Sequence, residues 1–153
     1  MPFYQLRTEQ LIKTDINTLW DFISSPENLK RITPEYMGFD ITSDKLSVKM
    51  YEGMIISYKV SPLFGIKATW VTEITHISEK EYFVDEQRVG PYKFWHHQHL
   101  LSEMEGGTMM QDIVSYSLPY GIIGSLVNKC LVRIKLNQIF NYRRLALEKI
   151  FRE

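Results

Sequence analysis

The chain has 153 residues, a length that suits one domain with a single hydrophobic core, and we expect one domain over residues 1–153. Its 18 lysine and arginine residues balance its 18 aspartate and glutamate residues, which argues against the strongly basic surface of a nucleic-acid-binding protein. The single cysteine excludes an intrachain disulfide framework, and no apolar run is long enough to span a bilayer, so we expect a cytoplasmic protein without stable membrane insertion.

The first 34 residues predict one strand followed by two short helices. Alternating side chains over residues 3–12 predict the strand. Thr14 or Asp15 then supplies an N-cap oxygen for a helix whose apolar residues recur at helical spacing. Ser25 and Pro26 end that helix and begin the next, with Ser25 as its cap and Pro26 at its first helical position. Two short helices therefore interrupt the sheet directly after its first strand.

The middle of the chain predicts an antiparallel meander. Strand-like runs cover residues 39–43, 54–61, 66–78 and 82–89. Turn signals recur about every ten residues, which is typical of consecutive antiparallel strands. The turn after the second run carries two large apolar side chains, Leu63 and Phe64. These two would gate the mouth of a pocket or contact a partner.

Residues 90–118 predict a hairpin that turns at Gly106 and Gly107, because two glycines readily supply positive φ angles. In that register His97 faces Tyr116, and both lie on one bulky, apolar face. The polar groups of this face are His97, His99, Asp112 and Tyr116. A packed core rarely holds so many polar groups, because each needs a partner once water is removed. The pattern therefore predicts a cavity at this face.

The C-terminal segment predicts one helix over residues 122–152 whose apolar pattern changes midway. The stripe of the first half consists of Ile123, Leu126, Val127, Cys130, Leu131 and Ile134. The stripe of the second half, on nearly the opposite side, consists of Leu136, Ile139, Phe140, Leu147 and Ile150. A bend or the short helices would bury the second stripe; the alternative is a second chain, which makes a homodimer through this helix. Six basic side chains, including Arg143, are predicted on its solvated sides.

This order of elements predicts an α+β fold, with a curved antiparallel sheet of about six or seven strands around the long C-terminal helix. Such a sheet cannot close tightly on a helix along its whole length, so we expect a hollow between them. Trp70, Phe83 and Trp95 are predicted to form the wall of this cavity, although ordinary core packing would explain each of them as well. The first half of the helix would contribute Val127 and Leu131.

Several motifs follow one another over nearly the whole chain. Among them are Pro26-Glu27-Asn28-Leu29, Trp70-Val71-Thr72-Glu73-Ile74, Trp95-His96-His97-Gln98-His99 and Asp112-Ile113-Val114-Ser115-Tyr116. In this order they resemble the START/Bet v 1-like (SRPBCC) superfamily of polyketide cyclases, dehydrases and lipid-transport proteins, and within it a bacterial ligand-binding subfamily related to cell-division inhibitors. The resemblance implies a helix-grip fold with a cavity for an apolar molecule, and no particular reaction.

From these observations we predict a protein that binds a small apolar or amphipathic molecule, with no cofactor and no catalytic residue assigned. The predicted ligand-binding residues are Trp70, Phe83, Asp85, Trp95, His97, His99, Asp112, Tyr116, Val127 and Leu131. Apolar burial would provide most of the affinity. His97, His99 and the carboxylate and phenol beside them would hold the polar end of the ligand.

Three other hypotheses remain open at the level of sequence. A histidine held by a carboxylate can act as a general acid or base, which would suit an enzyme of the cyclase or dehydratase type. His97 and His99 lie two apart on one strand face and could bind a metal with Asp112 or Glu103, but no further ligand is evident, so we predict no metal. The third hypothesis is a partner-regulating module that docks through the last helix.

Overall fold

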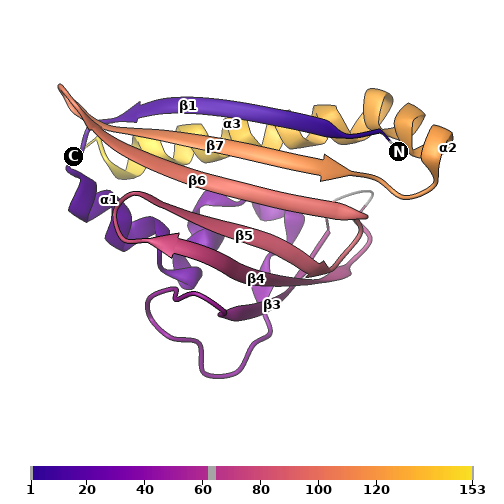
Figure 1. Ribbon diagram of the computed structural model, residues 1–153, viewed down its shortest axis with the longest axis horizontal. Coiled ribbons are helices and arrows are strands. Elements are labelled where there is room, and N and C mark those ends of the chain that lie inside the picture. The colour runs from indigo at the N-terminus through magenta and orange to yellow at the C-terminus, as the bar shows by residue number, and fades with distance from the viewer. Residues whose placement is uncertain (1, 62–64, 153) are drawn as a thin grey trace.

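The computed structural model describes residues 2–61 and 65–152, which form one antiparallel sheet with a long helix packed along it. Figure 1 shows helix α3 running behind strands β1 and β7, with α1 at one end of the sheet. Leu63 and Phe64, the predicted gate, lie outside the described residues. Among the described helices, none is long and apolar enough to cross a membrane.

The sheet has seven strands in the order β1-β7-β6-β5-β4-β3-β2, and every neighbouring pair is antiparallel. Its strands are β1 (Tyr4–Ile12), β2 (Asp40–Ile41), β3 (Ile55–Val60), β4 (Ala68–Ser78), β5 (Tyr82–Val89), β6 (Phe94–Met104) and β7 (Gly107–Ser117). Strands β2 to β7 pair with their neighbours along the chain, whereas β1 joins the sheet beside β7. The predicted meander and the number of strands are confirmed.

Short helical segments lie between β1 and β2 along the chain, and a longer helical run follows β7. They are α1 (Ile16–Ile23), the 3₁₀ segments η1 (Pro26–Ile32) and η2 (Glu35–Met37), α2 (Gly121–Val127), the π-helical segment η3 (Asn128–Val132) and α3 (Arg133–Ile150). The Asp15 side chain caps α1 by accepting hydrogen bonds from the backbone N–H groups of Asn17 and Thr18, both at 3.0 Å.

The register of the β6–β7 hairpin differs from the prediction by two residues. Met104 pairs with Gly107, so the turn consists of Glu105 and Gly106. Gly107 already belongs to β7 and packs so closely on β1 that a Cβ there would overlap the carbonyl oxygen of Ile12. Because side chains alternate with a period of two residues, a shift of two leaves every side chain on its predicted face. His97 and His99 are therefore both on the buried face, as predicted.

The second half of the C-terminal helical run packs on the sheet through its predicted apolar stripe, whereas the predicted stripe of the first half is exposed. Leu136, Phe140 and Leu147 are buried, whereas Ile123 and Leu126 are exposed. The prediction that the first stripe packs on the sheet is wrong, and so is docking of a second chain through Phe140, which packs within its own chain against His97. The residues of the first stripe that are exposed are Ile123, Leu126, Val127, Cys130 and Ile134.

The buried face before α3 is formed by residues that a hydrophobic pattern overlooks. Gly124, Asn128 and Val132 are buried at steps of four residues. In a regular α-helix, residues spaced four apart turn gradually away from the sheet, because one turn has only about 3.6 residues. The π-helical segment has more residues per turn and keeps these three residues on the same face. Asn128 is tolerated there because its Oδ1 accepts a hydrogen bond of 2.9 Å from the Tyr116 hydroxyl.

Candidate functional site

A cavity of about 150 Å³ lies between the concave face of the sheet, η1 and the middle of α3. Its wall is mostly apolar: Ile56, Val60 and Ile74 from the sheet meet Leu136 and Phe140 from α3. These five side chains are buried. A space of this size matches one aromatic ring, since an engineered apolar cavity of about 150 Å³ in another protein binds benzene.

Aromatic side chains form one side of this cavity. The rings of Trp70 and Trp95 meet edge to face with centroids 5.2 Å apart. Tyr92 packs against Trp95 with a centroid distance of 4.8 Å, and Tyr58 stacks on Trp70 at 6.1 Å. The indole Nε1–H of Trp70 donates to the Thr72 hydroxyl at 3.2 Å, which satisfies that buried donor.

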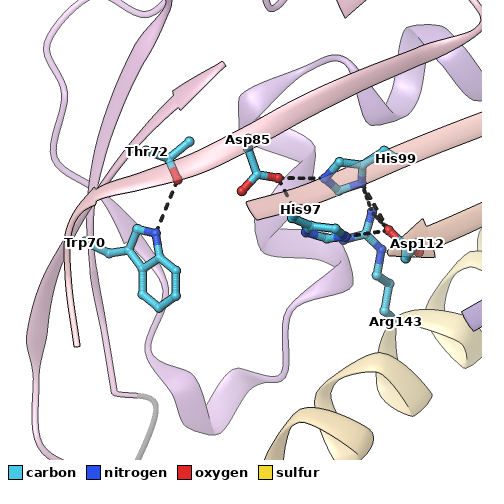
Figure 2. A network of polar contacts seen from close by, with 7 residues as sticks. All are labelled: Trp70, Thr72, Asp85, His97, His99, Asp112 and Arg143. Carbon is cyan, nitrogen blue, oxygen red and sulfur yellow. Dashed lines mark hydrogen bonds and ion pairs between the residues drawn. The ribbon is translucent and has the colours of Figure 1, made fainter. Parts of the chain in front are cut away.

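A cluster of five charged or titratable side chains lies at the opposite side. We call it the polar cluster, and its members are Asp85 of β5, His97 and His99 of β6, Asp112 of β7 and Arg143 of α3. Figure 2 shows both imidazoles between the carboxylate of Asp85 and that of Asp112. The positions of the two carboxylates and two imidazoles follow from the strand order, because β5, β6 and β7 are adjacent and these four side chains point to the concave face.

The distances define three hydrogen bonds within the polar cluster. His97 Nε2 lies 2.8 Å from Asp112 Oδ1, and His99 Nε2 lies 2.7 Å from Asp85 Oδ2. Arg143 Nη2 lies 3.2 Å from His99 Nδ1, so the guanidinium donates to an unprotonated nitrogen. His97 Nδ1, the fourth ring nitrogen, faces Asp85 Oδ2 at 3.4 Å.

Burial and mutual contact set the ionisation of these groups. Burial alone would raise the pKa of Asp112, but the Arg143 charge and the hydrogen bond from His97 hold it well below its ordinary value. The pKa of Asp85 is lowered too, because the His97 charge and the His99 hydrogen bond outweigh the effect of burial. Burial lowers the pKa of His97, and repulsion from His99 lowers it further, so His97 is neutral near pH 7.

Arg143 has one donor without a partner. Its Nε is buried and is the one side-chain nitrogen or oxygen among the described residues that is both fully enclosed and without a hydrogen bond. The side chain as a whole is only 11% exposed and lines the cavity. A buried donor without an acceptor is costly, and a ligand acceptor reaches this enclosed N–H only if neighbouring side chains move.

The predicted site residues divide into two groups. Those that line the cavity are Trp70, Phe83, Asp85, Trp95, His97 and His99. Asp112 contacts the histidines on the side opposite to Asp85 and lines a second, more polar pocket against α3. Tyr116 bonds to Asn128, away from the histidines, because its true partner across the hairpin is Trp95. Val127 and Leu131 also lie outside the cavity, since they belong to the half of the helical run that does not face it.

Sequence reasoning missed several lining residues. Tyr58, Tyr92, Phe140 and Arg143 line the cavity. Arg143 was detectable, because it follows Leu136 by seven residues and Phe140 by three and so continues their buried stripe. Its charge led to the wrong prediction of a solvated position.

Part of the polar cluster has the composition of a metal site. One ligand atom each from Asp85, His97 and His99 lie within 4.8 Å of one another. Two imidazoles and one carboxylate form a common ligand set for first-row divalent ions.

Comparison with solved structures identifies the fold. Crystal structures of TTHA0849 from Thermus thermophilus and of ginseng major latex-like protein 151 from Panax ginseng superpose with TM-scores of 0.68. TTHA0849 is 14% identical, with 95% of each chain covered, and the ginseng protein is 12% identical, with 97% of each covered. Ara h 8.0201 is 12% identical with a TM-score of 0.61, and 95% of this chain and 98% of that one are covered.

The chain has the helix-grip fold. At these identities the likeness shows the fold alone. No protein-family model matches the sequence, and the search of curated proteins found no match. Function must therefore be inferred from the cavity and the polar cluster themselves.

Proposed function

We propose that this chain binds a small, mainly apolar molecule in the cavity between its sheet and α3, and that it belongs to the START/Bet v 1-like superfamily. One observation carries the proposal: a mostly apolar cavity of about 150 Å³ has the buried cation Arg143 among its lining residues. The shared fold supports the superfamily assignment, and the motifs quoted above favour its cell-division-inhibitor-related bacterial subfamily.

The volume limits the ligand to about the size of one ring. A lipid or a polyketide with several rings needs more room than about 150 Å³, so in this conformation the pocket suits a monocyclic compound or the end of a longer one. Contact with Trp70, Trp95 and Tyr92 would provide most of the affinity by burial of apolar area, at about 25 cal/mol per Å². Aromatic walls favour a flat, unsaturated ligand over a flexible aliphatic one.

The charge of the polar cluster selects the polar group of the ligand. The two carboxylates of the cluster outnumber its single guanidinium, which disfavours an anionic ligand. The Arg143 Nε–H has no hydrogen-bond acceptor within the described residues. A neutral ligand oxygen, such as that of a phenol or a ketone, meets both conditions.

Titration with phenol tests this proposal, with binding followed by the fluorescence of Trp70 and Trp95. Phenol should bind more tightly than benzoate, which has a similar size and a negative charge. Val60→Phe should weaken binding at least tenfold, because Val60 lines the cavity and the larger ring would fill it. Val89→Phe, the same change at an exposed position of β5, should leave binding unchanged.

A thermal unfolding curve for each variant shows whether it folds, and Val60→Ile provides a milder reduction of the cavity. Equal binding of phenol by wild type and a folded Val60→Phe variant would contradict the proposal. Native mass spectrometry of protein purified from its source would show whether a natural ligand is retained.

The alternative function is an acid–base enzyme of the cyclase or dehydratase type. It is favoured by the neutral imidazole of His97, which lines the cavity and is held by the Asp112 carboxylate. Turnover of a bound carbonyl compound that is abolished by His97→Ala and by Asp112→Asn would support it. Turnover that survives both changes would exclude it.

We also propose that any homodimer uses α2. Ile122 and Ile123 are 90% and 69% exposed, and Leu126 is 65% exposed, so this short helix presents an apolar surface to its surroundings.

A further inference from the structure

We propose that the polar cluster is a binding site for one first-row divalent metal ion, such as Zn²⁺, with His97 Nδ1, His99 Nε2 and Asp85 Oδ2 as the protein ligands. The proposed metal site opens into the same cavity as the organic ligand proposed above, but the proposal does not depend on that ligand. The proposal rests on the direction in which each ring nitrogen points and on the proximity of three ligand atoms, which lie within 4.8 Å of one another.

Each imidazole lies between the same two carboxylates. On one side, His97 Nε2 and His99 Nδ1 lie 2.8 Å and 3.1 Å from Asp112 Oδ1. On the other side, His97 Nδ1 and His99 Nε2 lie 3.4 Å and 2.7 Å from Asp85 Oδ2. Four nitrogen–oxygen contacts thus involve two rings, and Figure 2 shows the two rings held side by side between the acids.

The N–H groups of two neutral imidazoles do not fill all four contacts. Two neutral imidazoles carry one N–H each, which accounts for two of the four contacts. Two contacts then have no hydrogen between their atoms. At His99 Nδ1 and Asp112 Oδ1, Arg143 donates to the nitrogen instead. At His97 Nδ1 and Asp85 Oδ2, either a second proton on His97 or a metal ion supplies the positive charge that the pair needs.

A metal ion satisfies all of them. If His97 Nδ1 and His99 Nε2 ligate the ion together with Asp85, the protons of both rings lie on the opposite nitrogens and point to Asp112. This change is a shift of tautomer at His99, with no net gain or loss of protons. Asp112 then accepts from both metal-bound histidines, the outer-shell arrangement that orients imidazole ligands in metalloproteins. Arg143 Nη2, already 3.6 Å from Asp112 Oδ1, would transfer its hydrogen bond to that oxygen.

The distances permit this coordination with small side-chain movements. Ligand atoms about 2.0–2.1 Å from Zn²⁺ in a tetrahedron are roughly 3.3 Å apart. Asp85 Oδ2 and His97 Nδ1 are 3.4 Å apart, and the 2.7 Å between Asp85 Oδ2 and His99 Nε2 has only to widen slightly. All three ligands line the cavity, so the open fourth position would face it. A dication adds two positive charges to the cluster, so this position favours an anionic donor atom.

Isothermal titration of the chelator-stripped protein with Zn²⁺ tests the proposal, together with the visible spectrum on addition of Co²⁺. We expect one equivalent to bind, with the intense absorption of tetrahedral cobalt. His97→Asn and Asp85→Asn should each weaken binding at least tenfold. Asp112→Asn should weaken it by about 10–100-fold, because Asp112 only orients the two imidazoles.

His96→Asn is the matched control. His96 lies on the same strand but on the opposite face of the sheet, where its Nδ1 is 2.8 Å from Glu86 Oε1. Its replacement should leave zinc affinity unchanged. Absence of stoichiometric binding by wild type, or equal loss of binding in His96→Asn and His97→Asn, would overturn the proposal.

X-ray absorption of the zinc-loaded wild-type protein provides a readout that requires no variant to fold. It should show two imidazoles in the coordination sphere, and a sphere without imidazole would also overturn the proposal. Every titration uses metal alone, so its result is independent of whether phenol binds.

Discussion

His97 Nε2 and Asp112 Oδ1 form a buried contact of 2.8 Å that joins strands β6 and β7 at the polar cluster. Neither side chain would be stable there by itself, because an ionised carboxylate or an imidazole without a partner is costly to bury. The contact depends on the sheet, which places both side chains on its concave face, and on Arg143, which reaches the pair from α3.

Replacing Asp112 should reduce the dependence of stability on acid pH. The pKa of Asp112 in the folded protein lies well below its ordinary value of 3.8, because Arg143 and His97 outweigh the effect of burial. The carboxylate therefore stabilises the fold above about pH 4, and this contribution is lost as the pH falls through the folded pKa. Urea denaturation from neutral to acid pH should show a shallower loss of stability below about pH 4 in Asp112→Asn than in wild type.

The lowered pKa of His97 also makes the folded protein less stable as the pH falls, but in a higher pH range than Asp112 does. The unfolded chain binds a proton near the ordinary value of 6.5 and the folded chain does not, so stability also falls as the pH drops below about 6.5.

The control for Asp112→Asn is Asp40→Asn, at an exposed position, which should keep the wild-type dependence of stability on pH. Identical acid slopes for wild type and Asp112→Asn would contradict the assignment of the Asp112 charge.

Arg143→Met should destabilise the protein by about 3 kcal/mol at neutral pH, because it leaves the two carboxylates of the cluster without their cation. Arg144→Met is the adjacent control: its guanidinium is half-exposed and pairs with Glu148, so the expected cost is below about 1 kcal/mol. Chemical denaturation measures both. A cost for Arg143→Met no larger than that for Arg144→Met would show that the buried charge does not stabilise the cluster.

Tyr116→Phe should separate structural from ligand-binding roles. It removes the donor to the buried Asn128 Oδ1 and should reduce the free energy of unfolding by about 1–3 kcal/mol. Phenol binding should not change, since Tyr116 lies outside the cavity lining. Tyr120→Phe, at a position that is 82% exposed, should change neither quantity. Loss of phenol binding in a folded Tyr116→Phe variant would show that Tyr116 takes part in ligand binding, as the sequence alone predicts.

Ile122→Glu should convert any homodimer to a monomer, because Ile122 is the most exposed of the apolar residues on α2. Light scattering measures the mass, and Leu145→Glu, a half-exposed position on α3, should leave it unchanged. A wild-type protein of monomeric mass would exclude the homodimer. Phe140→Glu should instead unfold the chain, because Phe140 is buried against His97.

Much of the fold was predictable because its signals are local. Alternation along the strands placed His97 and His99 on the buried face, and this assignment was unaffected by the error of two residues in register. The N-cap at Asp15 was likewise a local pattern. Gly107 misled the prediction of the turn, because it is required by close packing against Ile12 in a strand that is distant in sequence.

The candidate site was less predictable because it depends on the phase of the C-terminal helical run. The buried face is formed by Gly124 and Asn128 before it reaches Leu136, and the π-helical segment changes the phase between them. A hydrophobic pattern therefore selected Val127 and Leu131 in place of Phe140 and overlooked Arg143. Asp85 and Asp112 were found because the strand faces alone determine where they point.

A crystal structure of the protein soaked with phenol tests the central claim most directly. We predict density for one ring beside Trp70 and Trp95, with its oxygen within hydrogen-bonding distance of the Arg143 guanidinium. A cavity filled by the protein's own side chains, or imidazoles of His97 and His99 turned outward to bulk solvent, would contradict it.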